Sequence, residues 1–475
     1  MKKTLFLLFL IAVAAFVILM AVNKESAEQT WKRASSACSQ FVSPPSPAPS
    51  PEPARPAQTA HAPLQPLPAP AAAPTAQPLA PTANARAIFP IMPYVPVEKS
   101  RFGDRVPEVY SLLAKGGCTI VPGYVSDLDV AQAAGLKVLV TDPRVTRGDW
   151  KTVTEAQAEK DFLSLLKEIN DHPAVAGFFI GDEPGADCFN GIAIVYKLIA
   201  KHAPGKMAVL GLLPNYADPV TQCKTPDYET YVRSFVDICK PPMFGYDHYA
   251  LTPKALYPND AYWQNLEIFR KIGLEKNIPF FVWIQAGTFL NLREMSAADI
   301  RFAIYTVLAY GAKGIGEFPF LSTQVSDYHN EPIDGFGQPS PFFYNFQHAN
   351  EKLQRLGPEL LRLRSDAVYH YTSAGVPAGS RTLAEGDFVK AIKPNTKEYR
   401  LLVSEFTHMD SGERYVMVVN CDLKQQVNVT LEFAKAPKAV DYYEPYLGYY
   451  IDFKSYPGIP PGEGRLIRVT PKPEN

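Results

Sequence analysis

The fold of this chain is decided by one stretch, Val175-Ala176-Gly177-Phe178-Phe179-Ile180-Gly181-Asp182-Glu183-Pro184. A continuous apolar run of this length is typical of a β-strand that is buried on both faces. Proline has no N–H to donate and disfavours helical backbone at the residue before it, so the strand is predicted to end there. Asp182 and Glu183 are therefore predicted to lie at the carboxyl end of a buried strand, where α/β proteins place their active sites. Partial desolvation of such an acid raises its pKa and suits it to general-acid work. The alternative is that the pair only caps the start of a following helix.

Seven further segments of strand length alternate with helix-like segments around this stretch. The eight predicted strands cover residues 87–91, 118–122, 136–141, 175–183, 207–211, 243–247, 279–285 and 314–318. Eight strands that alternate with helices over this length predict an α/β fold, the (β/α)8 TIM barrel. A doubly wound open sheet is the alternative, and the lack of Gly-x-Gly-x-x-Gly after the first strand disfavours it.

The pattern changes after residue 363. Strand-length runs follow at residues 399–406, 414–420, 426–431 and 465–469, and turn residues separate them. This spacing predicts a small antiparallel β-sandwich. The predicted boundaries are residues 86–365 for the barrel and 366–475 for the sandwich.

The N-terminus has the sequence of a membrane segment. Lys2 and Lys3 precede an unbroken apolar run at residues 5–22, about long enough to span a bilayer, and no small-x-small cleavage site closes it. We expect an uncleaved signal-anchor at residues 1–24, which places the rest of the chain outside the cytoplasm, in the periplasm or at the cell surface. A cleaved signal peptide, and hence secretion, is the alternative. Residues 25–85 are rich in Pro and Ala and are predicted to be a disordered, extended linker.

The composition excludes some partners. The chain of 475 residues has 47 basic and 48 acidic side chains, so it carries no electrostatic footprint for nucleic acid. The spacing of its six cysteines matches no zinc motif, and neither a metal nor a cofactor is predicted. Cys188 and Cys223 both follow predicted strands, and export would permit a disulfide between them.

The candidate site residues lie at the strand ends. The predicted catalytic group consists of Glu183, Asp182, Asp247 and Glu317. The predicted substrate-binding group consists of Tyr94, Tyr246, His248, Tyr249, Trp283 and Gln285. Convergent carboxylates with aromatic neighbours match glycosidic cleavage, in which one acid protonates the leaving oxygen and a second group stabilises or attacks the carbon. Each member also has a structural reading: His248 as an orienting residue, Glu317 as half of an ion pair, and the aromatic rings as core.

Four segments carry a resemblance to a known family. They are Gly181-Asp182-Glu183-Pro184, Gly245-Tyr246-Asp247-His248-Tyr249, Gly311-Ala312-Lys313-Gly314-Ile315 and Pro461-Gly462-Glu463-Gly464-Arg465-Leu466. Over residues 87–470 the chain resembles the (β/α)8 glycoside hydrolases, particularly bacterial members with a C-terminal β-sandwich. The resemblance implies a hydrolase that cleaves glycosidic bonds of an extracytoplasmic carbohydrate, with Glu183 as general acid/base.

Two subtypes of that family remain open. In the large retaining clan the fourth strand ends in Asn-Glu-Pro and the seventh in a glutamate nucleophile, but this chain has Asp182 and Gln285 at those places. In the substrate-assisted N-acetylhexosaminidases, an adjacent Asp-Glu pair ends the fourth strand, and the aspartate orients the substrate's 2-acetamido group. Asp182 and Glu183 match that pair, and Tyr246 or Tyr249 would complete it. From other classes, a catalytically inactive carbohydrate-binding barrel and an envelope scaffold remain alternatives.

Overall fold

The computed structural model describes residues 88–255, 257–383, 386 and 388–473. The signal-anchor at residues 1–24 and the linker at residues 25–85 lie outside this range and stay predictions. Within the described part of the chain, no helix combines the length and the apolar character that a membrane crossing requires.

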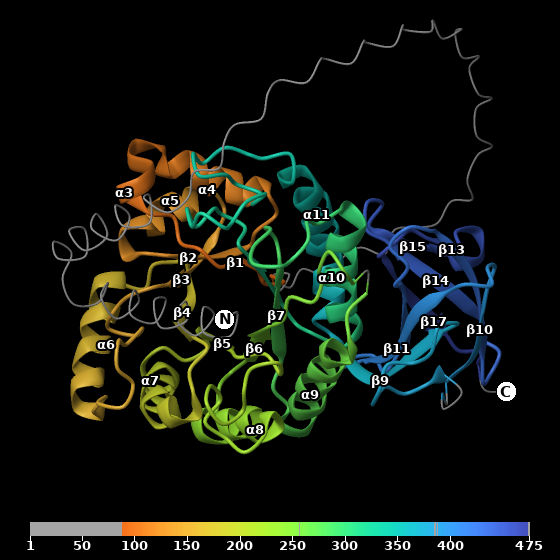
Figure 1. Ribbon diagram of the computed structural model, residues 1–475, viewed down its shortest axis with the longest axis horizontal. Coiled ribbons are helices and arrows are strands. Elements are labelled where there is room, and N and C mark those ends of the chain that lie inside the picture. The colour runs from red at the N-terminus through yellow and green to blue at the C-terminus, as the bar shows by residue number, and fades with distance from the viewer. Residues whose placement is uncertain (1–87, 256, 384–385, 387, 474–475) are drawn as a thin grey trace, which may run out of the picture. The chain divides into compact units, whose positions relative to one another are not determined.

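Eight parallel strands form a nearly closed barrel with helices around it (Figure 1). The strands are β1 (Ile91–Pro93), β2 (Ile120–Gly123), β3 (Lys137–Val140), β4 (Val175–Asp182), β5 (Met207–Leu212), β6 (Phe244–Asp247), β7 (Phe280–Gln285) and β8 (Ile315–Phe318). Because β8 pairs in parallel with β1, the alternative of an open doubly wound sheet is wrong. The eight predicted strands are confirmed. The first was predicted at residues 87–91 and lies at Ile91–Pro93.

The barrel has one seam, between β1 and β2, which lie at the two ends of the sheet order. Thr119 bridges it with three hydrogen bonds. Its backbone N–H donates to the carbonyl oxygen of Ile91 at 2.9 Å, and its Oγ1 accepts from the N–H of Ile91 at 2.9 Å. The same hydroxyl donates to the carbonyl oxygen of Phe89 at 2.8 Å. A threonine side chain thus supplies part of the closure.

Helices follow the strands along the chain. They are α3 (Lys99–Phe102), α4 (Val106–Lys115), α5 (Leu128–Ala133), α6 (Glu155–Ile169), α7 (Phe189–His202), α8 (Tyr228–Cys239), α9 (Asp260–Lys276), α10 (Ala297–Ala309) and α11 (Phe343–Leu360). Local sequence sets their ends. A reciprocal capping box between Ser296 and Asp299 starts α10, and left-handed Asn277 ends α9.

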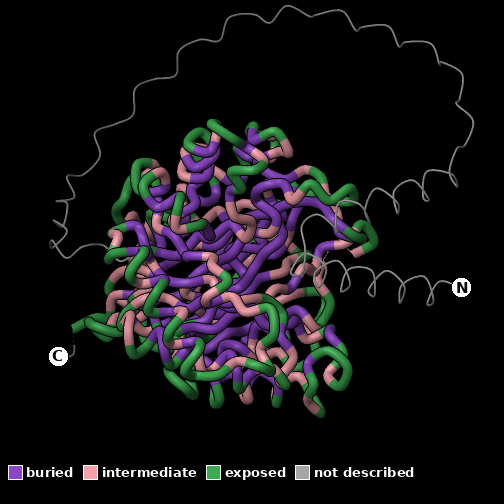
Figure 2. The backbone as a smooth tube through the Cα atoms, turned by 90° about the vertical axis from the view of Figure 1, so that its left-hand side faces the viewer, coloured by how far each residue is buried: buried purple, intermediate pink, exposed green. Residues whose placement is uncertain are grey.

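Strand alternation divides the barrel core into two layers. Inward side chains fill the barrel interior: Met92, Ile120, Leu139, Val209, Met243, Phe281 and Trp283. Outward side chains such as Val282 and Ile284 pack in the layer shared with the helices. Figure 2 shows the resulting concentration of buried residues along the central strands. Whether a residue points inward or outward therefore decides whether it reaches the mouth of the barrel.

Antiparallel sheets follow the barrel. One sheet has the order β15 (Tyr449–Asp452), β14 (Ala439–Glu444), β17 (Gly464–Thr470), β12 (Arg414–Asn420), β11 (Arg400–His408) and β9 (Leu363–Thr372). The other has the order β10 (Val389–Pro394), β13 (Val427–Phe433) and β16 (Gly458–Ile459). Val403 and Val418 of the first sheet share a buried cluster with Ile392 and Val429 of the second. Two sheets that face one another across a common core form a sandwich.

The turn before β17 seats these sheets on the barrel. Glu463, which is 4% exposed, accepts from Lys352 of α11 at 3.1 Å and lies 3.8 Å from Arg301 of α10. Gly462 has a φ of 72°, and a Cβ on it would stand 2.0 Å from the carbonyl oxygen of Ala298. Only glycine fits here, because the position combines a left-handed backbone with close backbone contact.

Candidate active site

The carboxyl end of β4 departs from regular strand geometry. β4 has register shifts against both neighbouring strands, and the next residue, Glu183, has a φ of 47°. A left-handed backbone costs a residue with a side chain about 1–2 kcal/mol, and such strain concentrates at functional sites. The N–H of Glu183 donates to the carbonyl oxygen of Gly211 at 2.8 Å, which holds this conformation. The left-handed residue ends the strand alternation and lets Asp182 and Glu183 serve one site.

Glu183 meets Asp247, which ends β6, in a hydrogen bond between their carboxyl groups. Burial raises the pKa of Asp247 well above its usual value, and the charges of Glu183 and Asp182 add to that effect. Burial also raises the pKa of Glu183, while the hydrogen bond from Asp247 opposes the rise. Each of the two carboxyls therefore favours its protonated form more than an isolated acid would.

Asp182 lies beside this pair. Its Oδ2 accepts a hydrogen bond from the hydroxyl of Tyr94 at 2.9 Å. Burial raises its pKa to about 7, the charge of Glu183 adds to the rise, and the Tyr94 hydrogen bond opposes it. Asp182 and Glu183 keep exposed surface, so solvent reaches them, but the surrounding protein displaces enough water to dominate their ionisation. Gly211 makes room, since a Cβ there would stand 2.5 Å from Oδ1 of Asp182.

Aromatic rings adjoin the three carboxyls. Edge contacts join Tyr94 to Phe179, Trp283 and Phe318 at centroid distances of 5.6, 5.2 and 5.0 Å. Phe318 continues to Phe289 at 5.3 Å and to Tyr249 and Tyr328 at 6.0 Å. We call these seven rings the aromatic cluster: Tyr94, Phe179, Tyr249, Trp283, Phe289, Phe318 and Tyr328. Three of the predicted binding residues, Tyr94, Tyr249 and Trp283, belong to it.

Two other predicted binding residues lie on the outer side of β6. Tyr246 is fully buried and packs on Phe269 of α9 at 4.2 Å, so its placement in the site is wrong. His248 is 6% exposed, and its Nδ1 contacts Oδ1 of Asn265 of α9 at 3.1 Å. Burial lowers the pKa of His248 to about 4, so it is neutral. The contacts of His248 fit the alternative role of an orienting residue. Oδ1 of Asn265 contacts His248 and also accepts from the N–H of Asn215 at 2.9 Å, so it links the segments that follow β5 and β6.

Gln285 is engaged by its own loop. Its Nε2 donates to the carbonyl oxygens of Gly287 at 2.9 Å and Arg293 at 2.7 Å. Only 3% of the residue is exposed, its Oε1 has no hydrogen-bond partner in the described structure, and the prediction that it binds substrate stays a prediction. Its role is to hold the loop after β7.

Glu317 lies outside the site. Its neighbours Gly316 and Phe318 face Trp283 and the aromatic cluster, so strand alternation turns Glu317 the other way. Its Oε2 accepts from Nδ2 of Asn350 of α11 at 3.2 Å, and none of it is exposed. Burial raises its pKa to about 8. This geometry gives no support to a catalytic role for Glu317, and no salt bridge to Glu317 forms among the described residues.

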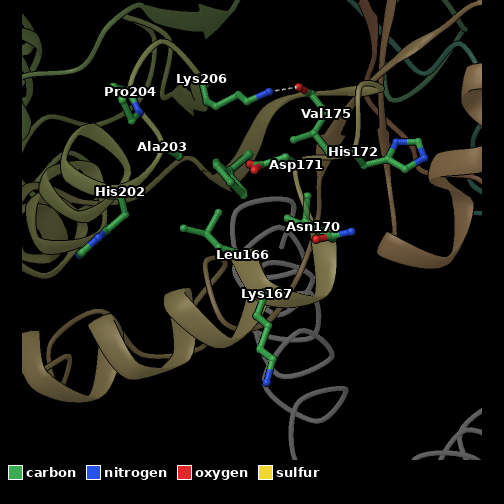
Figure 3. A pocket seen from close by; sticks show the side chains of 12 residues that line it. Leu166, Lys167, Asn170, Asp171, His172, Val175, His202, Ala203, Pro204 and Lys206 are labelled. Atoms are coloured by element: carbon green, nitrogen blue, oxygen red, sulfur yellow. Dashed lines mark hydrogen bonds between the residues drawn. The ribbon is translucent and has the colours of Figure 1, made fainter.

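A pocket of about 470 Å³ lies at the opposite end of β4 (Figure 3). It lies between the ends of α6 and α7, and there Nζ of Lys206 donates to the carbonyl oxygen of Val175 at 2.6 Å. The eight residues of β4 separate it from the carboxyls by roughly 20 Å.

Cys188 and Cys223 are free thiols, so the disulfide considered from the sequence is not formed.

Some site residues carry no clear sequence signal. Phe289 and Tyr328 lie in loops after β7 and β8, where aromatic residues have many other uses. Tyr216 is 58% exposed, and its ring contacts the His248 ring at a centroid distance of 5.0 Å. Partial desolvation raises the pKa of its hydroxyl, and the charges of Asp247 and Glu183 add to the rise. Its place just after the fifth strand was a usable signal.

Comparisons with known proteins give similarity of structure only. No family model matches the chain, and no curated protein matches it. A β-galactosidase from the psychrophilic Marinomonas ef1 is 12% identical with a TM-score of 0.42, and the match covers 58% of this chain and 62% of that one. A family 5 glycoside hydrolase from Bacteroides vulgatus is 13% identical with a TM-score of 0.49, covering 81% and 89%. A family 42 β-galactosidase from G. stearothermophilus is 8% identical with a TM-score of 0.49, covering 80% and 98%. The solved structures similar to this chain thus include several glycoside hydrolases.

Proposed function

We propose that this protein is a glycoside hydrolase that acts on an extracytoplasmic carbohydrate, with Glu183 as general acid/base. One observation carries the proposal: Asp182, Glu183 and Asp247 meet at the carboxyl ends of β4 and β6, beside the aromatic cluster. Glycosidic cleavage needs an acid for the leaving oxygen and negative charge near an oxocarbenium-like carbon. Aromatic faces supply apolar contact for sugar rings. The location outside the cytoplasm rests on the N-terminal sequence alone.

The hydrogen bond between Glu183 and Asp247 restricts their division of labour. In retaining and inverting enzymes a sugar carbon or a water lies between the two catalytic carboxyls. Two carboxyls that hydrogen-bond one another directly leave no such room between their bonded oxygens. We assign this pair one function, in which Asp247 supplies and recovers the proton that Glu183 delivers to the leaving oxygen.

Asp182 is then the second group. Ionised, with Tyr94 holding one of its oxygens, it can stabilise the cationic carbon or orient a 2-acetamido group. The inactive carbohydrate-binding barrel stays the alternative, and the observation that favours it is Gln285, engaged by its loop at the end of β7. Hydrolysis of a glycoside, despite the lack of a nucleophile on β7, would favour the enzyme over the inactive barrel.

The experiment compares Glu183→Gln with the unaltered protein on two aryl glycosides of one sugar. A general acid contributes about 10²–10⁴-fold to rate, so hydrolysis of the substrate with the poor leaving group should fall by that factor. The activated aryl group departs without a proton, so its cleavage step should fall less. Asp182→Asn should slow both substrates equally if Asp182 acts at the carbon.

Glu317→Gln is the matched control, because it also removes a buried carboxyl from this barrel, but on the far side of β8. It should keep its activity. Unchanged hydrolysis of the poor leaving group by Glu183→Gln would remove Glu183 from the mechanism. Sugar binding without hydrolysis of any glycoside in a broad panel would favour the inactive barrel.

A further inference from the structure

The charged groups that shift the pKa values of the site carboxyls are these carboxyls themselves. We call Asp182, Glu183 and Asp247 the carboxyl cluster. After burial, the charge of Glu183 raises the pKa of Asp182, and both of these charges raise the pKa of Asp247. The side-chain hydrogen bonds acting on them come from each other and from the hydroxyl of Tyr94. No cationic side chain of the described residues is among the groups that act on these carboxyls, so any negative charge that the cluster carries has no positive partner there.

The same place holds polar atoms ready for a ligand. Trp283 is 1% exposed, and its Nε1 has no hydrogen-bond partner among the described residues. That nitrogen stands 3.3 Å from the point where a Cβ on Gly211 would lie, and Oδ1 of Asp182 stands 2.5 Å from the same point. Oδ1 of Asp247 is likewise buried without a partner in the described structure. The indole N–H and the carboxylate therefore lie close to one another, on either side of the position that a Cβ on Gly211 would occupy.

The aromatic cluster supplies a second attraction for positive charge. Tyr94 hydrogen-bonds Asp182, and its ring contacts Trp283 and Phe318. Tyrosine rings attract cations through their faces, and Tyr94 and Tyr249 are only partly buried, whereas Trp283 is 1% exposed. An ammonium group beside a carboxylate gains a charge-assisted hydrogen bond as well. A neutral sugar gains neither contribution, and a uronic acid would be repelled.

We propose that the substrate carries a free ammonium group, as in a glycan of 2-amino-2-deoxyhexose units without N-acetylation. This inference rests on the proposed function, because it places the sugar in the same site. The ammonium balances the carboxyl cluster, and hydroxyl groups of the sugar accept from the indole N–H of Trp283. N-acetylation removes the positive charge, so this proposal and the 2-acetamido reading predict opposite preferences.

Equilibrium binding to the full chain tests the proposal. Glucosamine, galactosamine and mannosamine are each compared with the parent hexose and the N-acetyl derivative by calorimetry at about pH 7. One charge-assisted contact to such an acid is worth about tenfold in affinity. For at least one of the three sugars, the amine should bind tighter than both relatives by that factor. If none does, the inference is wrong, whichever neutral or acidic sugars bind.

Two variants tie the preference to the cluster. Asp182→Asn keeps the shape and removes one charge, so the amine should lose about tenfold more affinity than the parent hexose loses. Glu317→Gln should leave the preference unchanged. An amine preference that survives Asp182→Asn would overturn the assignment. The proposed function is tested separately. An amine preference without hydrolysis of any glycoside indicates a binding protein. Hydrolysis without an amine preference refutes the ammonium substrate but not the hydrolase.

Discussion

Glu317→Gln gives a prediction whose size follows from the structure. The buried carboxyl has a pKa of about 8 in the folded protein against an ordinary 4.5. Between these values the folded protein holds a proton that the unfolded chain has released, so rising pH favours unfolding. At about 1.4 kcal/mol for each pH unit, the full loss of stability is about 5 kcal/mol, of which about 3–4 kcal/mol falls between pH 5 and pH 8.

The glutamine variant removes this loss. Its amide can donate to Oδ1 of Asn350, a buried acceptor without a partner in the described structure, and accept from Nδ2 of the same residue. Urea unfolding of both proteins at pH 5 and pH 8 measures the effect. The difference in unfolding free energy, variant minus unaltered protein, should grow by about 3–4 kcal/mol over that range. Comparing the variant with the unaltered protein cancels the other titrating groups.

Two results would refute this reasoning. Parallel pH curves for the two proteins would mean that Glu317 ionises normally in the fold. A loss of hydrolysis as large as that of Glu183→Gln, at full stability, would return Glu317 to the catalytic group.

Three further changes test the site and its support. Tyr94→Phe removes a hydrogen bond that lowers the pKa of Asp182, so the limb of the pH–rate profile that reports Asp182 should move to higher pH. Gly211→Ala places a Cβ 2.5 Å from Oδ1 of Asp182 and should reduce kcat by about 10- to 100-fold with an unchanged circular dichroism spectrum. Gly462→Ala meets the carbonyl oxygen of Ala298 and requires a left-handed alanine, so we expect a loss of at least about 1–2 kcal/mol in thermal unfolding, with kcat retained.

The sequence predicted the barrel because its apolar period is strong. Each strand is a short apolar run between turn residues, and each was found within a few residues of its predicted place. The acids Asp182 and Asp247 directly end their strands, so the rule that active sites lie at strand ends brought them to the same place. Glu183 joins them through a left-handed backbone that no sequence pattern reveals.

The failures share one physical cause. Glu317, Tyr246 and His248 also lie at strand ends, but each occupies the outward position of its strand. A shift of one residue moves a side chain from one face to the other, and element boundaries read from sequence are not that sharp. The surroundings of Gln285 could not be predicted for another reason: its Nε2 donates to backbone carbonyls of its own loop, and loop conformation is not encoded in any periodic pattern.

The seam at Thr119 makes one edge of the barrel the first to exchange its amide hydrogens. Ladders join the other neighbouring strands, but across the seam the N–H of Ile91 relies on a hydroxyl group. Transient opening there breaks the hydrogen bonds of Thr119 but no strand ladder, and it would move β1 together with Tyr94 just beyond its end. Each opening would withdraw the tyrosine hydroxyl from Asp182 and return the acid to a higher pKa. Opening of the seam between β1 and β2 is thus coupled to the ionisation of Asp182.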